Sequence, residues 1–423
     1  MSTRKSIQYR GKSTGTSLIE LMISQTIGLV VIGAVLSLVA PSISGFATNV
    51  SVSNLQESGR IALEELDLAI RQSGYHGCNP AASRLNVVNT NHPDISEALE
   101  NWAYADYRIK GFDAEDAESI NSVLGHGWQQ RRLRHADTYI GDMIQVRQTK
   151  GSEFRVVHHD PVAQTISFEG DLTDQLVTGQ ILELNDCFQA TTLQIDRDNS
   201  PEYRSLTNST IVRYGSDETV NCAAVNSDPF SSSQFGDVVL LGGNPGTSCE
   251  SAGANEFFAE YQFLPGTTAH IVVNSIYYIG RKDDAGDTYL YRTGPANDGA
   301  SVYTEALVEG VENLRFLYGI DLDENETPDV YHSAAWLNNQ PDLWAQVVSV
   351  KTWLMLNSVT THSQSEVQPS ISFPDRTGEM FNCSQPTQIS ASICPPPLRS
   401  VDEDHFYNRR VIEKEIYIRN STL

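Results

Sequence analysis

Basic residues and recognisable catalytic motifs are both scarce in this chain. Of its 423 residues, 29 are Lys or Arg and 53 are Asp or Glu, which gives a formal charge of −24. Nucleic-acid binding needs a basic surface to meet the phosphates, so this composition argues against such a partner. The sequence has no G-x-S-x-G and no H-E-x-x-H motif, and Gly11-Lys12-Ser13 is not a phosphate-binding loop because Ser6 stands where its first glycine is required. The sequence therefore predicts no enzyme.

The fragment His158-His159-Asp160 is the one histidine-rich stretch that resembles part of a metal site. Adjacent residues on a strand face opposite ways, so a strand would not turn these side chains toward one ion. A surface turn or a strand end is the favoured interpretation.

No C-x-x-C pair occurs, which excludes the usual zinc-ribbon and thioredoxin patterns. There are six cysteines, at Cys78, Cys187, Cys222, Cys249, Cys383 and Cys394. With an export segment present, disulfides formed in an oxidising compartment are the better interpretation. Six cysteines allow about 15 pairings, and the sequence alone does not choose among them. The local pair Cys383 with Cys394 is the first expectation, and Cys222 with Cys249 and Cys78 with Cys187 then follow by elimination.

Long hydrophobic runs are also rare, since only Leu18–Val39 could cross a bilayer. Glu20 interrupts this run near its start. A carboxylate in lipid costs on the order of 3 kcal/mol, so it should have a partner. The residues before the run contain four basic side chains and no acid, which favours a cytoplasmic location for them.

Three interpretations of this N-terminus compete. The first is a secretory signal peptide cleaved near Gly45-Phe46-Ala47. The second is a plain membrane anchor that tolerates an acid. The third is a cleaved leader that ends at Gly15, which also accounts for the basic residues and for Glu20.

The third interpretation rests on a resemblance to the type IV prepilin N-terminus. Gly15 ends a short basic leader, Thr16 would be the first mature residue, and Glu20 would be the fifth in SLIELM. The resemblance implies cleavage by a prepilin peptidase, N-methylation of Thr16, and a filament in which the N-terminal amine of a neighbouring subunit neutralises Glu20. The family's major subunits usually have Phe where this chain has Thr16.

The helix is predicted to continue beyond the membrane after a kink or break at Pro41 and Gly45. A one-sided apolar stripe then recurs at helical spacing and should pack on a sheet. Gly74 is expected to close the helix. The stripe contains Val52, Leu55, Ala62, Leu66 and Ile70, and the charged residues Glu57, Arg60, Glu64, Glu65 and Asp67 occupy other faces.

From residue 75 onward, short β-like runs alternate with Gly, Asn, Asp and Ser. Residues 282–287 are expected to join two of these runs in a hairpin. Residues 359–404 lack a regular pattern and are expected to form a loop held by a disulfide. The predicted strands are 142–148, 180–186, 237–243, 274–281, 288–294, 345–358 and 413–420.

Several of these segments resemble the PilW family of minor pilins. They are SGYHGC (73–78), LNDCFQATTLQI (184–195), IYYIGR (276–281), LVEGVENLRFLYGIDLDEN (307–325), VVSVKTWLML (347–356) and NRRVIEKEIYIRN (408–420). The resemblance implies an α+β, pilin-like fold in which a long hydrophobic N-terminal helix packs on a large β-rich globular domain. We expect a basic leader at 1–15, a helix at 16–75 with a membrane or filament-core part (16–40) and an amphipathic part (46–74), and an extracytoplasmic domain at 76–423.

The resemblance also implies a function in pilus assembly and priming, with a place at the tip. The implied partners are other minor and major pilins, the prepilin peptidase and the assembly platform of the inner membrane. The protein would cross that membrane once and then enter the extracellular pilus. Two alternatives stay open, a minor pseudopilin of type II secretion and an adhesive binding module displayed on the pilus.

One small ligand site is a candidate, in the sequence DLDENETPD. Asp321, Asp323, Asn325 and Asp329 fall at the first, third, fifth and ninth positions of a calcium loop. Glu326 replaces the turn glycine of such a loop, and His332 stands where a bidentate acid is usual. A solvated acidic hairpin loop without an ion is the alternative. No other cofactor is predicted.

Overall fold

The computed structural model describes residues 17–75, 83–86, 108–114, 134–135, 138–215, 262–281, 288–295, 302–358, 362–363, 371–383, 393–394, 405–406 and 409–419. The chain divides into two compact units, Met1–Ser53 and Asn54–Leu423. We call the second unit the head.

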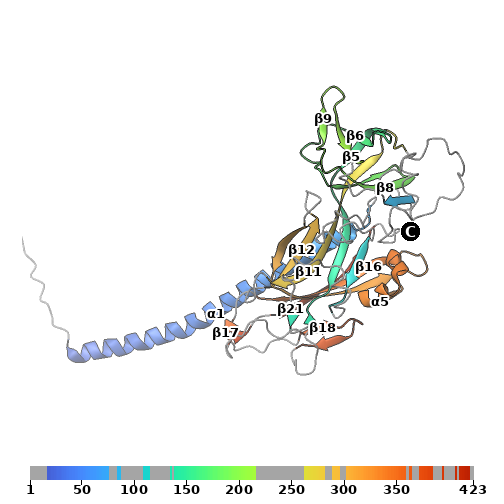
Figure 1. The fold of residues 1–423 in the computed structure, drawn as a ribbon. Coiled ribbons are helices and arrows are strands. Elements are labelled where there is room, and N and C mark those ends of the chain that lie inside the picture. The colour runs from blue at the N-terminus through green and yellow to red at the C-terminus, as the bar shows by residue number, and fades with distance from the viewer. Residues whose placement is uncertain are drawn as a thin grey trace, which may run out of the picture. The chain divides into compact units, whose positions relative to one another are not determined.

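One long helix, α1 (Leu18–Arg71), forms the N-terminal part of the described chain (Figure 1). The helix runs through Pro41 and Gly45, so of the kink or break predicted there, the break is wrong. A proline removes one backbone hydrogen bond, and the turns on either side keep theirs. The glycine predicted to close the helix does so: Gly74 has φ of +69°, and its N–H donates to the carbonyl of Arg147 at 3.2 Å.

Strands dominate the head, which confirms an α+β chain with an apolar N-terminal helix and a large β-rich region. The larger sheet contains β1 (Ser83–Asn86), β2 (Ile109–Phe112), β5 (Met143–Asp160), β6 (Thr165–Glu169), β7 (Ile181–Asn185), β8 (Gln189–Gln194), β9 (Glu202–Arg204), β10 (Ser209–Arg213), β11 (Thr268–Arg281), β12 (Thr288–Pro295) and β13 (Val302–Glu309). Its main path runs β1-β8-β7-β11-β5-β6-β10-β9, while β12 and β13 extend from β11, and β2 pairs with β5.

A second sheet has the order β15-β14-β16-β21 and is antiparallel throughout. Its strands are β14 (Val311–Ile320), β15 (Val330–His332), β16 (Val347–Asn357) and β21 (Arg409–Tyr417). The remaining elements are the pairs β3 (Arg134–His135) with β4 (Thr138–Tyr139), β17 (His362–Ser363) with β20 (His405–Phe406) and β18 (Ser372–Pro374) with β19 (Met380–Asn382), the helix α5 (Ala334–Asn338) and the 3-10 helix η2 (Pro341–Gln346).

Each predicted strand that falls on described residues overlaps an observed strand, and 237–243 lies outside them. The predicted hairpin is confirmed, because β11 and β12 pair in antiparallel fashion with Arg281 opposite Thr288. Within 359–404, the described residues contain only short strands of two or three residues, as expected for a stretch without regular periodicity.

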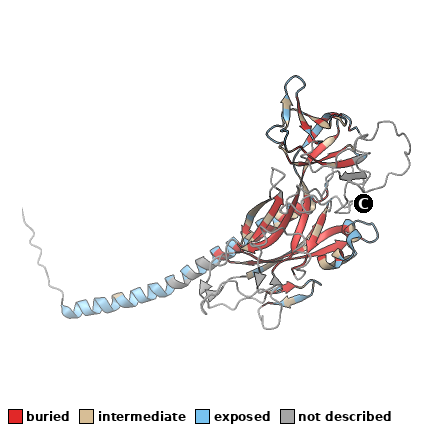
Figure 2. Ribbon diagram, viewed as in Figure 1, coloured by how far each residue is buried: buried red, intermediate tan, exposed pale blue. Residues whose placement is uncertain are grey.

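The head has two large hydrophobic cores, and β5 and β11 are long enough to contribute to both (Figure 2). The helix core is built around α1, β14 and β16, and it includes Leu66, Ile70, Phe316 and Leu354. The lobe core lies among β6, β7, β8 and β10 and includes Phe154, Phe168, Leu184 and Val212. The lobe core lies largely in residues 154–214, N-terminal to the smaller sheet in the sequence.

The part of α1 that belongs to the head buries its apolar stripe, as the sequence predicted. Leu55, Ala62, Leu66 and Ile70 are buried in the helix core. Gly59 allows the close approach, because a Cβ there would overlap the side chains of Ile412 and Leu356. Val52 was also placed in the stripe, but it is exposed; it precedes the compact unit that begins at Asn54.

Charged residues beside the stripe add specific contacts to the helix–head interface. Glu65 accepts a hydrogen bond from Arg292 of β12 at 2.7 Å, and Asp67 lies 2.9 Å from the Lys414 ammonium of β21. These contacts fix the rotation and the axial position of α1 on the head. The exposed pair between Arg60 and Glu57, at 2.7 Å, contributes little by comparison.

Candidate functional site

Glu20 lies in the first turn of α1 and is exposed in the described chain. Its N–H donates to the carbonyl of Ser17 at 3.0 Å, so the helix already includes the backbone of Glu20. A carboxylate near the N-terminus of a helix is favoured by the helix dipole. Gly15 and Thr16, the residues predicted to flank the cleavage, lie outside the described residues.

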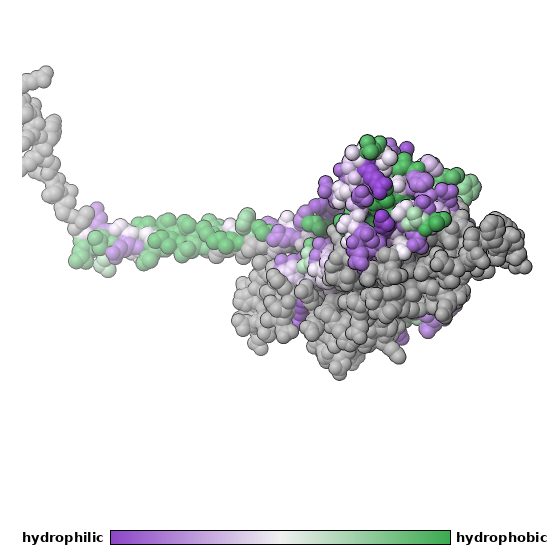
Figure 3. All heavy atoms as spheres, turned by 45° about the horizontal axis from the view of Figure 1, so that its top comes forward, coloured by the Kyte–Doolittle hydropathy of each residue, from purple (hydrophilic) through white to green (hydrophobic). Residues whose placement is uncertain are grey.

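The segment that follows Glu20 is mostly apolar. Leu18–Val39 is long and apolar enough to cross a membrane, and none of that stretch is buried within the chain. In Figure 3 this stretch of the helix is largely green, with purple and white residues near its start. The exposed side chains include Leu21, Ile27, Val31 and Leu38. This helix is compatible with a single-pass membrane anchor. In water its apolar side chains would stay exposed to solvent.

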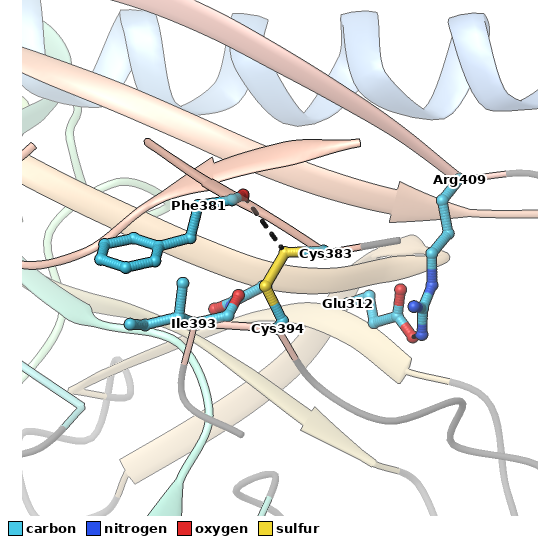
Figure 4. The surroundings of a disulfide bond; sticks show 7 residues. Glu312, Phe381, Cys383, Ile393, Cys394 and Arg409 are labelled. Atoms are coloured by element: carbon cyan, nitrogen blue, oxygen red, sulfur yellow. Dashed lines mark hydrogen bonds and ion pairs between the residues drawn. A yellow bond between two sulfur atoms is a disulfide. The ribbon is translucent and has the colours of Figure 1, made fainter. Parts of the chain in front are cut away.

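A disulfide lies on the face of the smaller sheet that is opposite α1. It joins Cys383 and Cys394, whose Cα atoms are 5.2 Å apart (Figure 4). Both cysteines are buried against Trp353, Met355 and Phe373. α1 covers the other face of this sheet through Leu354 and Leu356. The disulfide thus holds Phe373, Cys383 and Cys394 against β14 and β16.

A buried ion pair lies beside this disulfide, between Glu312 and Arg409 at 2.5 Å (Figure 4). Burial raises the pKa of the Glu312 carboxyl, and the Arg409 guanidinium opposes that shift. Asn313 adds a hydrogen bond from its amide to the carbonyl of Ile393 at 2.9 Å. The Asn313 hydrogen bond connects the disulfide-bonded residues to β14, and the ion pair connects β14 to the start of β21.

The other cysteine predictions fall largely on undescribed residues. Cys187 is disulfide-bonded, and its partner lies outside the described residues. Cys78, Cys222 and Cys249 also lie outside them. The pairs Cys78 with Cys187 and Cys222 with Cys249 stay predictions.

The predicted calcium loop follows β14 and brings three of its four acidic or amide side chains together. Asp321, Asp323 and Asp329 each place one carboxylate oxygen within 4.8 Å of the others. Glu326, which replaces the turn glycine, has φ of +64°, so the backbone adopts the glycine-like turn despite the side chain. The loop geometry therefore agrees with the spacing of a calcium loop.

Asn325 and His332, two positions of the predicted calcium loop, make contacts of another kind. The Asn325 side-chain oxygen accepts the N–H of Thr327 at 2.8 Å, within the loop itself. His332 stacks on Trp336, with ring centroids 3.7 Å apart. Asp321 is largely buried, and its carboxylate accepts the backbone N–H groups of Asn325 and Glu326 at 3.2 and 2.6 Å. Burial acts to raise the pKa of Asp321, but these backbone donors outweigh it and lower that pKa.

Calcium binding therefore stays a prediction, with a direct measurement available. Titration of Ca²⁺ into the purified full chain is expected to release or absorb heat, and Asp323→Ala should weaken binding by about 10-fold or more because it removes a charged ligand. Glu324→Ala removes an exposed acid of the same loop outside the cluster and should leave the affinity unchanged. No heat with the unmutated chain would end the idea.

The structure also contains polar sites that the sequence did not reveal. Arg315 and Asp142 form a fully buried ion pair at 3.0 Å, and Arg147 pairs with Glu183 at 2.6 Å. His159 is fully buried rather than on the surface, although β5 does end beside it, at Asp160. Its exposed neighbour His158 faces the other way, as strand alternation predicted. Strand alternation is the one sequence signal that could have shown that one of the two histidines is buried and the other exposed.

Comparison with known proteins finds one match, in the C-terminal part of the chain. Residues 276–420 match the family model PilW, described as Type IV Pilus-assembly protein W. The match covers a third of the chain and includes the whole smaller sheet together with β12 and β13. The resemblance stated from the sequence is confirmed for residues 276–420, which are similar to the PilW family of type IV pilus-assembly proteins. No curated protein and no solved structure matches it.

Proposed function

We propose that this chain is a minor pilin that takes part in priming type IV pilus assembly and occupies the pilus tip. One observation carries the proposal: a helix with an acid in its first turn and an apolar stretch long enough to cross a membrane belongs to the same chain as a PilW region. The acid and the apolar stretch are the features that a filament core uses, and the PilW region belongs to a family of pilus assembly proteins.

In this proposal, residues 1–15 stay on the cytoplasmic side until the prepilin peptidase cuts after Gly15. The cut creates an amine at Thr16, which is then methylated. When helices gather in the filament core, the carboxylate of Glu20 meets the amine of a neighbouring subunit. A carboxylate buried without a cation would be costly there, so the pairing selects one axial register between subunits.

The head supports the tip position. A repeating shaft subunit has to fit between neighbours, whereas a tip subunit has room for additions such as the lobe core, which lies outside the matched region. The alternative in type II secretion has similar N-terminal chemistry, and the PilW match favours the pilus over it. An adhesive module would be supported by calcium-dependent binding of the acidic loop to a surface or glycan.

Mass spectrometry of the mature N-terminus tests the processing step. The chain recovered from membranes is expected to begin at a methylated Thr16. A chain beginning near Thr48 would instead indicate signal-peptidase cleavage, and an intact Met1 would indicate a plain anchor. Either of these two results would remove the amine that is proposed to pair with Glu20.

A further inference from the structure

His159 joins two segments that are far apart in the sequence. The backbone N–H of Phe263 donates to its Nδ1 at 3.0 Å, and its Nε2 lies 2.8 Å from the hydroxyl of Tyr214. Because Nδ1 accepts a hydrogen bond, it carries no proton, so the neutral ring must carry its proton on Nε2 and donate it to Tyr214. The structure therefore fixes both the charge and the tautomer of this imidazole.

The two groups held by His159 stand at either end of residues 216–261, which lie outside the described residues. Tyr214 follows β10, and Phe263 precedes β11. Gln262 adds a second contact, from its side-chain amide to the carbonyl of His159 at 2.8 Å. Farther along, Gly266 and Thr267 bond to the backbone of Val156 at 2.8 Å each. Segment 262–267 is thus fastened along β5, with His159 at one end.

We propose that His159 is an acid-sensitive clasp: its neutral ring holds Tyr214 and Phe263 together at the end of β5, and protonation releases Phe263. An imidazolium has N–H donors at both ring nitrogens and cannot accept the N–H of Phe263. Protonation would therefore place two donors against each other in an apolar core, beside the rings of Phe263 and Tyr214. The least costly response is for segment 262–267 to leave β5.

Among the described residues, the charges around the ring do not compensate for its protonation. Burial lowers the pKa of His159 to about 4, and it outweighs Asp160, which favours the charged ring, while His158 disfavours it. The carboxylate of Asp160 accepts the N–H groups of Val162 and Ala163 at 3.0 and 2.9 Å. Burial also raises the pKa of Tyr214, so this partner stays protonated at neutral and acidic pH.

The direction of the pH effect follows from these values. An open segment exposes His159 with its ordinary pKa of 6.5, whereas the closed segment holds it near 4. The clasp is therefore at full strength above about pH 6.5 and weakens as the pH falls toward 4. Between about pH 7 and about pH 4.5, the opening constant of the segment should rise roughly 50-fold.

Hydrogen exchange of the purified full chain, corrected for the intrinsic effect of pH on exchange, tests the clasp. The amides of Val156, Phe263 and Gly266, which donate hydrogen bonds across this contact, should lose about 50-fold in protection between the two pH values, while amides of β14 and β16 should not. His159→Gln keeps an acceptor but cannot titrate, so its loss of protection should be nearly flat with pH. His158→Gln, at the exposed neighbouring position, should retain the full pH dependence.

Two results would overturn the proposal. One is equal pH dependence of protection in segment 262–267 and in β14. The other is a His159→Gln chain that keeps the pH dependence of the unmutated chain. If His159→Gln does not fold, the comparison of the two regions in the unmutated and His158→Gln chains still decides the question.

Discussion

A chain in which Glu20 is replaced by alanine is expected to reach the membrane at normal levels and to be lost from the pilus. The substitution makes Leu18–Val39 more apolar, so it should not impair insertion of the helix into the membrane. In the filament core, however, the amine of the neighbouring subunit would then be buried without a counter-charge. Breaking a buried pair costs about 3–5 kcal/mol, which corresponds to a fall in incorporation of roughly 100- to 4,000-fold.

Immunoblots of sheared pili and of membranes measure the two pools. Glu20→Gln should fail as Glu20→Ala does, because an amide has no charge to offset the amine. Gln25→Ala changes another polar residue of the same exposed apolar stretch and should leave incorporation unchanged. Pili that contain Glu20→Ala at the normal level would contradict the pairing and, with it, the assembly step proposed here.

A second large effect is expected at the helix–head interface. Leu66 is fully buried in the helix core, so Leu66→Ala should lower the free energy of unfolding of the head by about 2–5 kcal/mol, through lost transfer energy and a cavity. Chemical denaturation of the full chain in detergent, followed by tryptophan fluorescence, measures the change.

Leu68 provides a matched control two residues away. Its side chain is 55% exposed on the same helix, so Leu68→Ala makes the same change in helix propensity and should shift the free energy by less than about 0.5 kcal/mol. Equal destabilisation by the two substitutions would mean that the described docking of α1 on the smaller sheet is wrong.

Local periodicity allowed much of the fold to be predicted. The apolar run at Leu18–Val39, the stripe that includes Leu66, and the hairpin closed by Arg281 and Thr288 all follow from spacing along the chain. Hydrophobic periods of 3.6 and 2 residues are properties of short windows, so they survive without knowledge of distant contacts. The same local reasoning predicted a kink or break at Pro41, and the break is wrong because a long helix tolerates the loss of one hydrogen bond.

The candidate sites divide in the same way. The acidic loop could be found from its alternating carboxylates, and Asp321, Asp323 and Asp329 do converge. The sequence could not show that Asn325 bonds to Thr327 within the loop. That choice depends on side-chain rotamers and on a left-handed backbone at Glu326, and neither is determined by spacing alone.

By itself, the sequence determined that this protein has one apolar helix with an acid near its start, an amphipathic continuation and a β-rich remainder. Those properties depend on the order of residue types over a few turns or strands. Only the tertiary structure decided that His159 is a buried, neutral clasp and that Arg315 is neutralised by Asp142. A buried polar group requires a partner, and a partner more than a hundred positions away can be identified only once the chain has folded.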